Sequence, residues 1–113
     1  MATPPASPRA PRHPANIALH HRLTKTPTTE AAWRMFELEH SRFRQIMKTC
    51  QEATALDERG RVTLTPEAVA KQQRFGAIYS HFFNAVALKI GNDITPEQRS
   101  RLWLASLEAN AYV

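Results

Sequence analysis

Residues 75 to 90 read FGAIYSHFFNAVALKI, and on a helix their apolar side chains point in almost every direction. A narrow polar strip, formed by Gln73, Ser80, His81 and Asn84, interrupts them on one side. A helix on the surface of a globular protein shows an apolar stripe of only about 100°. This segment is therefore predicted to be covered on most sides by other helices.

Capping signals on either side of this segment set the predicted helix boundaries. Thr65-Pro66-Glu67 and Thr95-Pro96-Glu97-Gln98 each place a proline after an N-cap threonine, at the helical position where proline is best tolerated. Gly60 and Gly91 are predicted to end the preceding helices in the left-handed conformation. The predicted helices cover residues 29–57, 66–90 and 96–110, with a brief extended stretch at 61–64.

The first predicted helix carries one apolar seam. The residues of this seam recur at spacings of three and four, and they are Trp33, Phe36, His40, Phe43, Met47 and Cys50. The short connections between the helices favour antiparallel neighbours. We therefore predict an all-α fold, a small three-helix bundle with two long antiparallel helices and a shorter C-terminal helix.

The first 27 residues differ in composition from the rest of the chain. They hold six of the eight prolines and no Asp or Glu, and their cations are Arg9, Arg12, Arg22 and Lys25. Residues 28–113 are nearly neutral, with eleven Lys and Arg against ten Asp and Glu. The sequence therefore predicts an extended, basic, Pro-rich arm at residues 1–27 and a helical bundle domain at residues 28–113.

The apolar segment at 75–90 also suggests a function. Two other helices are too few to cover it, so we expect a second copy or another protein to pack against it. The predicted function is a non-enzymatic protein–protein interaction or regulatory module, and the expected partner contacts are Phe75, Tyr79, Phe82, Phe83, Val86, Trp103 and Tyr112. The apolar C-terminal end is expected to dock on the second long helix or on the partner. The sequence does not decide between a homo-oligomer and a hetero-complex.

The basic arm favours an alternative function, nucleic-acid binding. Arg9, Arg12, Arg22 and Lys25 have no acidic neighbours, so they can follow a phosphate backbone or an acidic protein surface. A solvated tail explains the same composition without any binding. Helix-turn-helix, zinc-finger and basic-zipper patterns are missing from the sequence.

A third hypothesis is a metal-dependent bundle enzyme. Glu37 and His40 form a Glu-x-x-His pair of the kind found in di-metal bundles, and His81 on the next helix can approach it. Such a site needs two of these pairs and further inward glutamates, which this chain lacks. We therefore predict no metal, no cofactor, no catalytic residue and no small-molecule substrate. Cys50 is predicted to be a small buried residue and not a reactive thiol.

The same residues indicate a compartment. A single cysteine is typical of a reducing environment, and the N-terminus shows no apolar core of a secretory signal. The longest apolar run of the helical part, Ala85 to Leu88, is far shorter than the ~20 residues that cross a bilayer. We expect a cytoplasmic protein without membrane contact.

Overall fold

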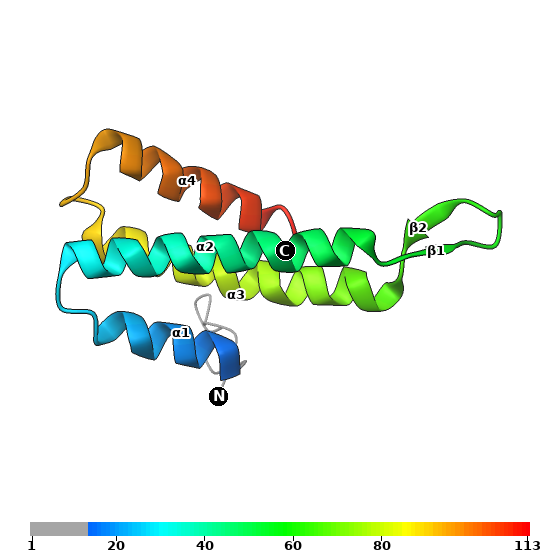
Figure 1. The fold of residues 1–113 in the computed structure, drawn as a ribbon, viewed down its shortest axis with the longest axis horizontal. Coiled ribbons are helices and arrows are strands. Elements are labelled where there is room, and N and C mark those ends of the chain that lie inside the picture. The colour runs from blue at the N-terminus through cyan, green and yellow to red at the C-terminus, as the bar shows by residue number, and fades with distance from the viewer. Residues whose placement is uncertain (1–13) are drawn as a thin grey trace, which may run out of the picture.

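The structure, a computed structural model, describes residues 14–113. These residues form helices and one hairpin in the order α1 (Pro14–Thr24), α2 (Thr29–Glu52), β1 (Thr54–Leu56), β2 (Val62–Leu64), α3 (Pro66–Ile90) and α4 (Pro96–Asn110). The helices α2 and α3 run side by side along the molecule, and α1 and α4 flank this pair on opposite sides (Figure 1). The all-α prediction is confirmed, but the described residues form four helices and a hairpin where three helices were predicted.

Capping begins three of these helices at the predicted places. The side chains of Thr28, Thr65 and Thr95 each accept a hydrogen bond from a backbone N–H three residues further on. At Thr95 the bond is reciprocal, because the Gln98 side chain accepts from the Thr95 N–H at 2.9 Å. A cap of this kind stabilises a helix by about 1 kcal/mol. Local chemistry alone therefore accounts for where α2, α3 and α4 begin.

The end of the first long helix differs from the prediction. The helix α2 stops at Glu52, and the chain then forms a hairpin in which Leu56 of β1 lies opposite Val62 of β2. Asp57 holds the turn, because its carboxylate accepts hydrogen bonds from the backbone N–H groups of Arg61 and Arg59, and chiefly the bond from Arg61 lowers the pKa of Asp57. The hairpin projects beyond the ends of α2 and α3 (Figure 1).

The two glycines predicted as left-handed helix ends behave differently. Gly60 has a φ of +75°, but it shapes the turn of the hairpin. Gly91 follows α3 at the predicted place, yet its φ of −57° is right-handed. The prediction for Gly91 is therefore wrong in conformation, although α3 does end there. Its N–H donates to the Ala87 carbonyl, which closes the last turn of the helix.

A different glycine brings α4 close to α3. A Cβ atom at Gly76 would lie 2.6 Å from the Cβ of Tyr112 and 2.9 Å from the carbonyl oxygen of Ala109, so only glycine fits this crossing. Ser80 adds a hydrogen bond to the Asn110 side chain at 2.6 Å. The C-terminal end therefore docks on α3 of its own chain, which is one of the two arrangements that the sequence left open.

The prediction of an extended arm is wrong for residues 14–24. These residues form α1, and Leu19 and Leu23, four positions apart, are buried in the core. No helix was predicted here because prolines are frequent at the start of the chain. Pro14, however, stands at the first position of α1, where a missing N–H costs no hydrogen bond. Arg9 and Arg12 lie outside the described residues.

The aromatic side of the central helix α3 is covered within a single copy of the chain, although Leu88 near the end of α3 is 89% exposed. Of the predicted partner contacts, Tyr79, Phe82, Phe83 and Val86 are at most 5% exposed. They pack in one core with residues of α1, α2 and α4. The cover that the prediction lacked is α1, so these four residues are corrected from partner contacts to core residues.

Candidate functional site

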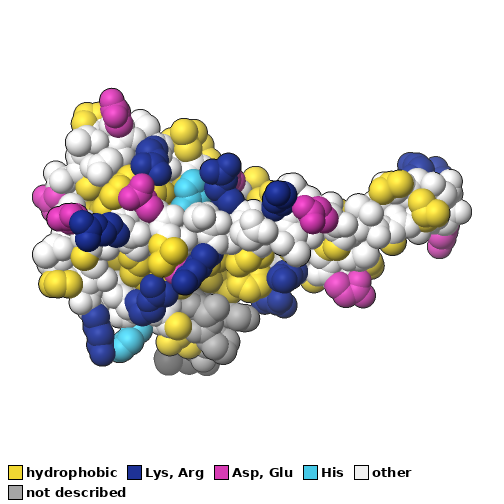
Figure 2. Space-filling view, viewed as in Figure 1, with side chains coloured by type: hydrophobic (Ala, Val, Ile, Leu, Met, Phe, Trp, Pro, Cys, Tyr) yellow, Lys and Arg dark blue, Asp and Glu magenta, His cyan; other side chains and the backbone are white. Residues whose placement is uncertain are grey.

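The outward face of α4, defined here as Trp103, Leu104 and Leu107, is apolar. These side chains are 66%, 62% and 48% exposed. Their spacing places them on one side of α4, while Leu102, Ala105 and Ala109 pack on the opposite side against the bundle. Figure 2 shows yellow apolar side chains reaching the surface over the α4 region of the molecule. A solvent-facing helix side normally carries polar residues, so this face is a candidate contact surface.

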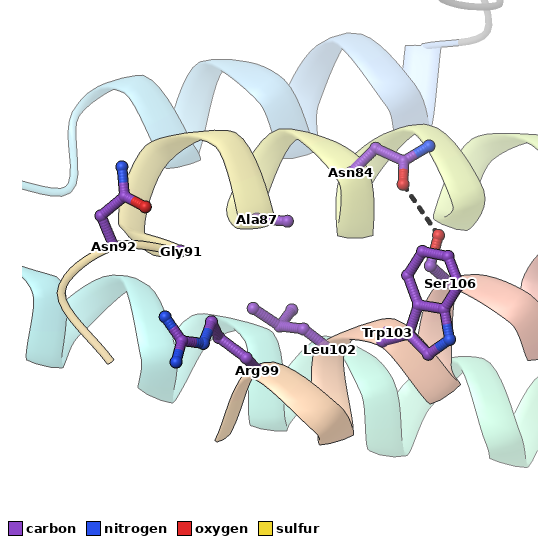
Figure 3. A pocket seen from close by; sticks show the side chains of 8 residues that line it. All are labelled: Asn84, Ala87, Gly91, Asn92, Arg99, Leu102, Trp103 and Ser106. Carbon is purple, nitrogen blue, oxygen red and sulfur yellow. Dashed lines mark hydrogen bonds between the residues drawn. The ribbon is translucent and has the colours of Figure 1, made fainter. Parts of the chain in front are cut away.

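A hollow continues this face inward, between α4 and the end of α3 (Figure 3). Its volume is about 380 Å³. The lining residues are Asn84, Ala87, Gly91, Asn92, Arg99, Leu102, Trp103 and Ser106. The Ser106 hydroxyl donates to the Asn84 side chain across it at 2.8 Å. The hollow thus combines an apolar floor with polar groups that can bond to a neighbouring chain.

Charged side chains border the other edge of α4, where it meets α2. Arg101 pairs with Glu37 at 3.3 Å, and its guanidinium carbon lies 5.1 Å from the centre of the Trp33 ring. Glu108 lies 3.2 Å from the His40 ring nitrogen. Exposed pairs of this kind contribute about 0–1 kcal/mol each. They orient α4 on α2 while leaving both charged side chains of α4 accessible.

A buried carboxylate lies on the opposite side of the bundle. Glu39 of α2 is 2% exposed, and it accepts a hydrogen bond from the Tyr79 hydroxyl at 3.0 Å. Arg22 of α1 and Arg42 of α2 donate to it at 3.3 and 2.6 Å. Two guanidinium groups therefore balance a charge that would be costly to bury alone. Burial, and then the nearby Glu39 carboxylate, raise the pKa of Tyr79.

The burial of Glu39 was not predicted from the sequence. Glu39 stands in a polar stretch beside Glu37, and glutamate is usually exposed. One signal was present, because Glu39 lies three residues after Phe36 and four before Phe43, which places it on the apolar seam. Five of the six predicted seam residues are buried, namely Trp33, Phe36, Phe43, Met47 and Cys50, whereas His40 is half-buried.

Two histidines meet where α1 packs on α3. The rings of His20 and His81 are 6.1 Å apart between centroids. Burial lowers the pKa of His81, and the neighbouring His20 lowers it further. His40 instead contacts α4, so Glu37, His40 and His81 do not come together. Within residues 14–113, no three His, Cys, Asp or Glu residues form a group that could hold a metal ion.

The remaining predicted site residues are less accessible than expected. Phe75 and Tyr112 are half-buried against the core, which leaves Trp103 as the predicted partner contact with the largest exposure. Arg22 is turned toward Glu39, while Lys25 is exposed just after α1. Cys50 is buried, as predicted.

Comparison of the chain with family models, curated proteins and solved structures found no match. Among the described residues, every helix is too short or too polar to span a bilayer. Function is therefore inferred from the surfaces of the chain itself.

Proposed function

We propose that this chain is a non-enzymatic protein–protein interaction module that self-associates through the outward face of α4. The observation that carries the proposal is the joint exposure of Trp103, Leu104 and Leu107 beside a hollow. The proposed occupant is a second copy, because a two-fold axis across α4 sets this face against itself. The proposal moves the predicted contact from the central helix to α4 and retains Trp103. The single cysteine still predicts a cytoplasmic, reducing location.

The charge pattern of α4 favours an antiparallel pairing. When Trp103 of one copy faces Leu107 of the second copy, Arg101 lies near Glu108 of the second copy. Opposite charges then meet twice, once on each side of the axis, and the two helix dipoles oppose each other favourably. Ser100 and Ala111, which are small and exposed, stand at the two ends of the face and allow close approach.

The size of the face predicts a weak complex. A helix of 15 residues is about 22 Å long, so the contact is smaller than the ~800 Å² per partner of a standard stable interface. We therefore expect a dimer with a Kd of roughly micromolar magnitude. Such a dimer forms and dissociates with concentration, which suits a regulatory module.

Sedimentation velocity over a dilution series tests this proposal. The variant Leu104→Glu places a charge in the face and is expected to raise the dimer Kd at least tenfold. The matched control is Leu56→Glu, because Leu56 is 71% exposed on the distant hairpin, and this change should leave the Kd unaltered. A wild-type chain that stays monomeric at about 100 times the expected micromolar Kd contradicts the proposal.

Nucleic-acid binding through the basic arm is the alternative, and it has weaker support. Arg22 is engaged with Glu39, and Lys25 is the other arm cation within the described residues. If the alternative holds, the chain binds a generic single strand at ~50 mM salt and loses affinity steeply as salt rises. Absence of binding under those conditions rejects it.

A further inference from the structure

The helix α1 is a short element with few anchors. It has 11 residues, and the side chains that it buries among residues 17–24 are Leu19 and Leu23. Ile17 is 58% exposed. Helices of this length are marginal in water without tertiary contacts, so α1 persists only while it is docked. Four residues, 25–28, connect it to α2, which allows it to leave without disturbing the α2–α3 pair.

The surface that α1 covers, called the groove below because it would open if α1 left, has a defined chemistry. Leu19 and Leu23 enter the same core cluster as Ile78 and Phe82 of α3, which are 0% and 2% exposed. Beside these apolar residues, the Glu39 carboxylate accepts a hydrogen bond from Arg22. Departure of α1 therefore uncovers an apolar strip and an acidic group at a fixed position next to it.

We propose that this groove is a helix-docking site, occupied by α1 in the resting chain and open to a partner helix of the pattern Leu-x-x-Arg-Leu. The pattern is that of Leu19, Arg22 and Leu23 themselves. Side chains three and four positions apart share one helix face, so the two leucines fill the apolar strip while the arginine reaches Glu39. The occupant is therefore an amphipathic protein helix that competes directly with α1.

Glu39 gives this site its selectivity. A partner with glutamate at the arginine position would bring a second carboxylate to a group that is 2% exposed, which is strongly unfavourable. A partner with leucine or alanine there leaves Glu39 with Arg42 and Tyr79 but loses the Arg22 contact. The groove thus distinguishes a basic amphipathic helix from an acidic one of equal hydrophobicity.

Fluorescence anisotropy with a labelled peptide of residues 14–24 tests the proposal on the full chain. In the host variant Leu19→Asp/Leu23→Asp, the intrachain competitor is lost, so the peptide is expected to bind at least tenfold tighter than to wild type. An Arg22→Glu peptide should lose at least tenfold in affinity for this host. An Ile17→Asp peptide, changed on the exposed side, should bind as the parent does. Equal binding of the parent and Arg22→Glu peptides, or equal affinity of both hosts, overturns the proposal.

Hydrogen exchange on the unmodified chain provides a test that does not depend on the host variant folding. The amides of α1 are expected to exchange at least tenfold faster than those at the centre of α3. Equal rates show that α1 opens only with the whole molecule, and they overturn the proposal.

The docking site does not depend on self-association through α4. Peptide binding measured in a Leu104→Glu background should be unchanged, so each proposal can fail without the other. If the Leu104→Glu chain still forms a dimer and this dimer is lost on the Leu19→Asp/Leu23→Asp change, the occupant is α1 of a second copy. That result overturns the assignment to a partner protein.

Discussion

The two helices that flank the α2–α3 pair use their apolar residues in opposite ways. The helix α1 turns both leucines of residues 17–24 inward and is held by them and by the Arg22–Glu39 pair. The helix α4 turns Leu102 and two alanines inward and crosses α3 at a glycine, while Trp103, Leu104 and Leu107 stay outside. Close backbone packing at a glycine thus lets one large inward side chain, Leu102, suffice for α4, and the other large apolar side chains remain available for another contact.

The largest effect is expected from a substitution that fills the space at Gly76, where α4 crosses α3. Gly76→Leu forces the end of α4 away from α3, because even a Cβ would overlap with Tyr112. Overpacking of this kind is expected to lower the free energy of unfolding by about 3 kcal/mol. Chemical denaturation followed by circular dichroism measures the change. Ala70→Leu, at an exposed position of the same helix, is the control and should have little effect.

A pair of leucine deletions compares the two flanking helices directly. Leu23→Ala removes a buried side chain and is expected to cost about 2 kcal/mol, limited by the free energy with which α1 docks. Leu104→Ala removes an exposed side chain, and in dilute solution it should change stability by less than about 0.5 kcal/mol. Urea denaturation at submicromolar concentration gives both values. Similar costs for the two variants would show that the helices are anchored alike.

Acidification is expected to have a smaller effect on stability, through His81, which lies where α1 packs on α3. In the folded chain the pKa of His81 lies below 6.5, the ordinary value for histidine, chiefly because of burial and then because of the neighbouring His20. The unfolded chain therefore binds the proton first, and stability decreases as pH falls below about 6.5 toward the folded pKa. In His81→Gln this part of the pH dependence should disappear, whereas the exposed His21→Gln should retain it. Thermal unfolding at several pH values distinguishes them, and identical profiles would contradict the assignment to His81.

What could be predicted from the sequence was local. Thr65 and Thr95 stand beside their prolines and cap the N–H groups a few residues away, so the starts of α3 and α4 needed no tertiary information. The end of α2 was mispredicted because Asp57 and Gly60 were interpreted as a helix end. In the structure these residues close a hairpin turn: the Asp57 carboxylate accepts a hydrogen bond from the Arg61 N–H, and Gly60 has a left-handed φ.

What could not be predicted depended on contacts between distant segments. Leu19 and Leu23 form too short an apolar pattern to predict a helix among prolines, and only their docking on α3 shows that α1 completes the cover of the core. Glu39 becomes a buried group only when Arg22 and Tyr79, 17 and 40 residues away, reach it. The candidate α4 face likewise required knowing which side of α4 the bundle covers.

Amide hydrogen exchange at low and high protein concentration tests two properties of the molecule together: the chain buries the aromatic residues of α3 within one copy, and a second copy binds the outward face of α4. Raising the concentration through the micromolar range is expected to slow exchange at residues 100–107 and to leave exchange at residues 78–86 unchanged. Slower exchange confined to residues 78–86, or no change in either segment, would contradict this expectation.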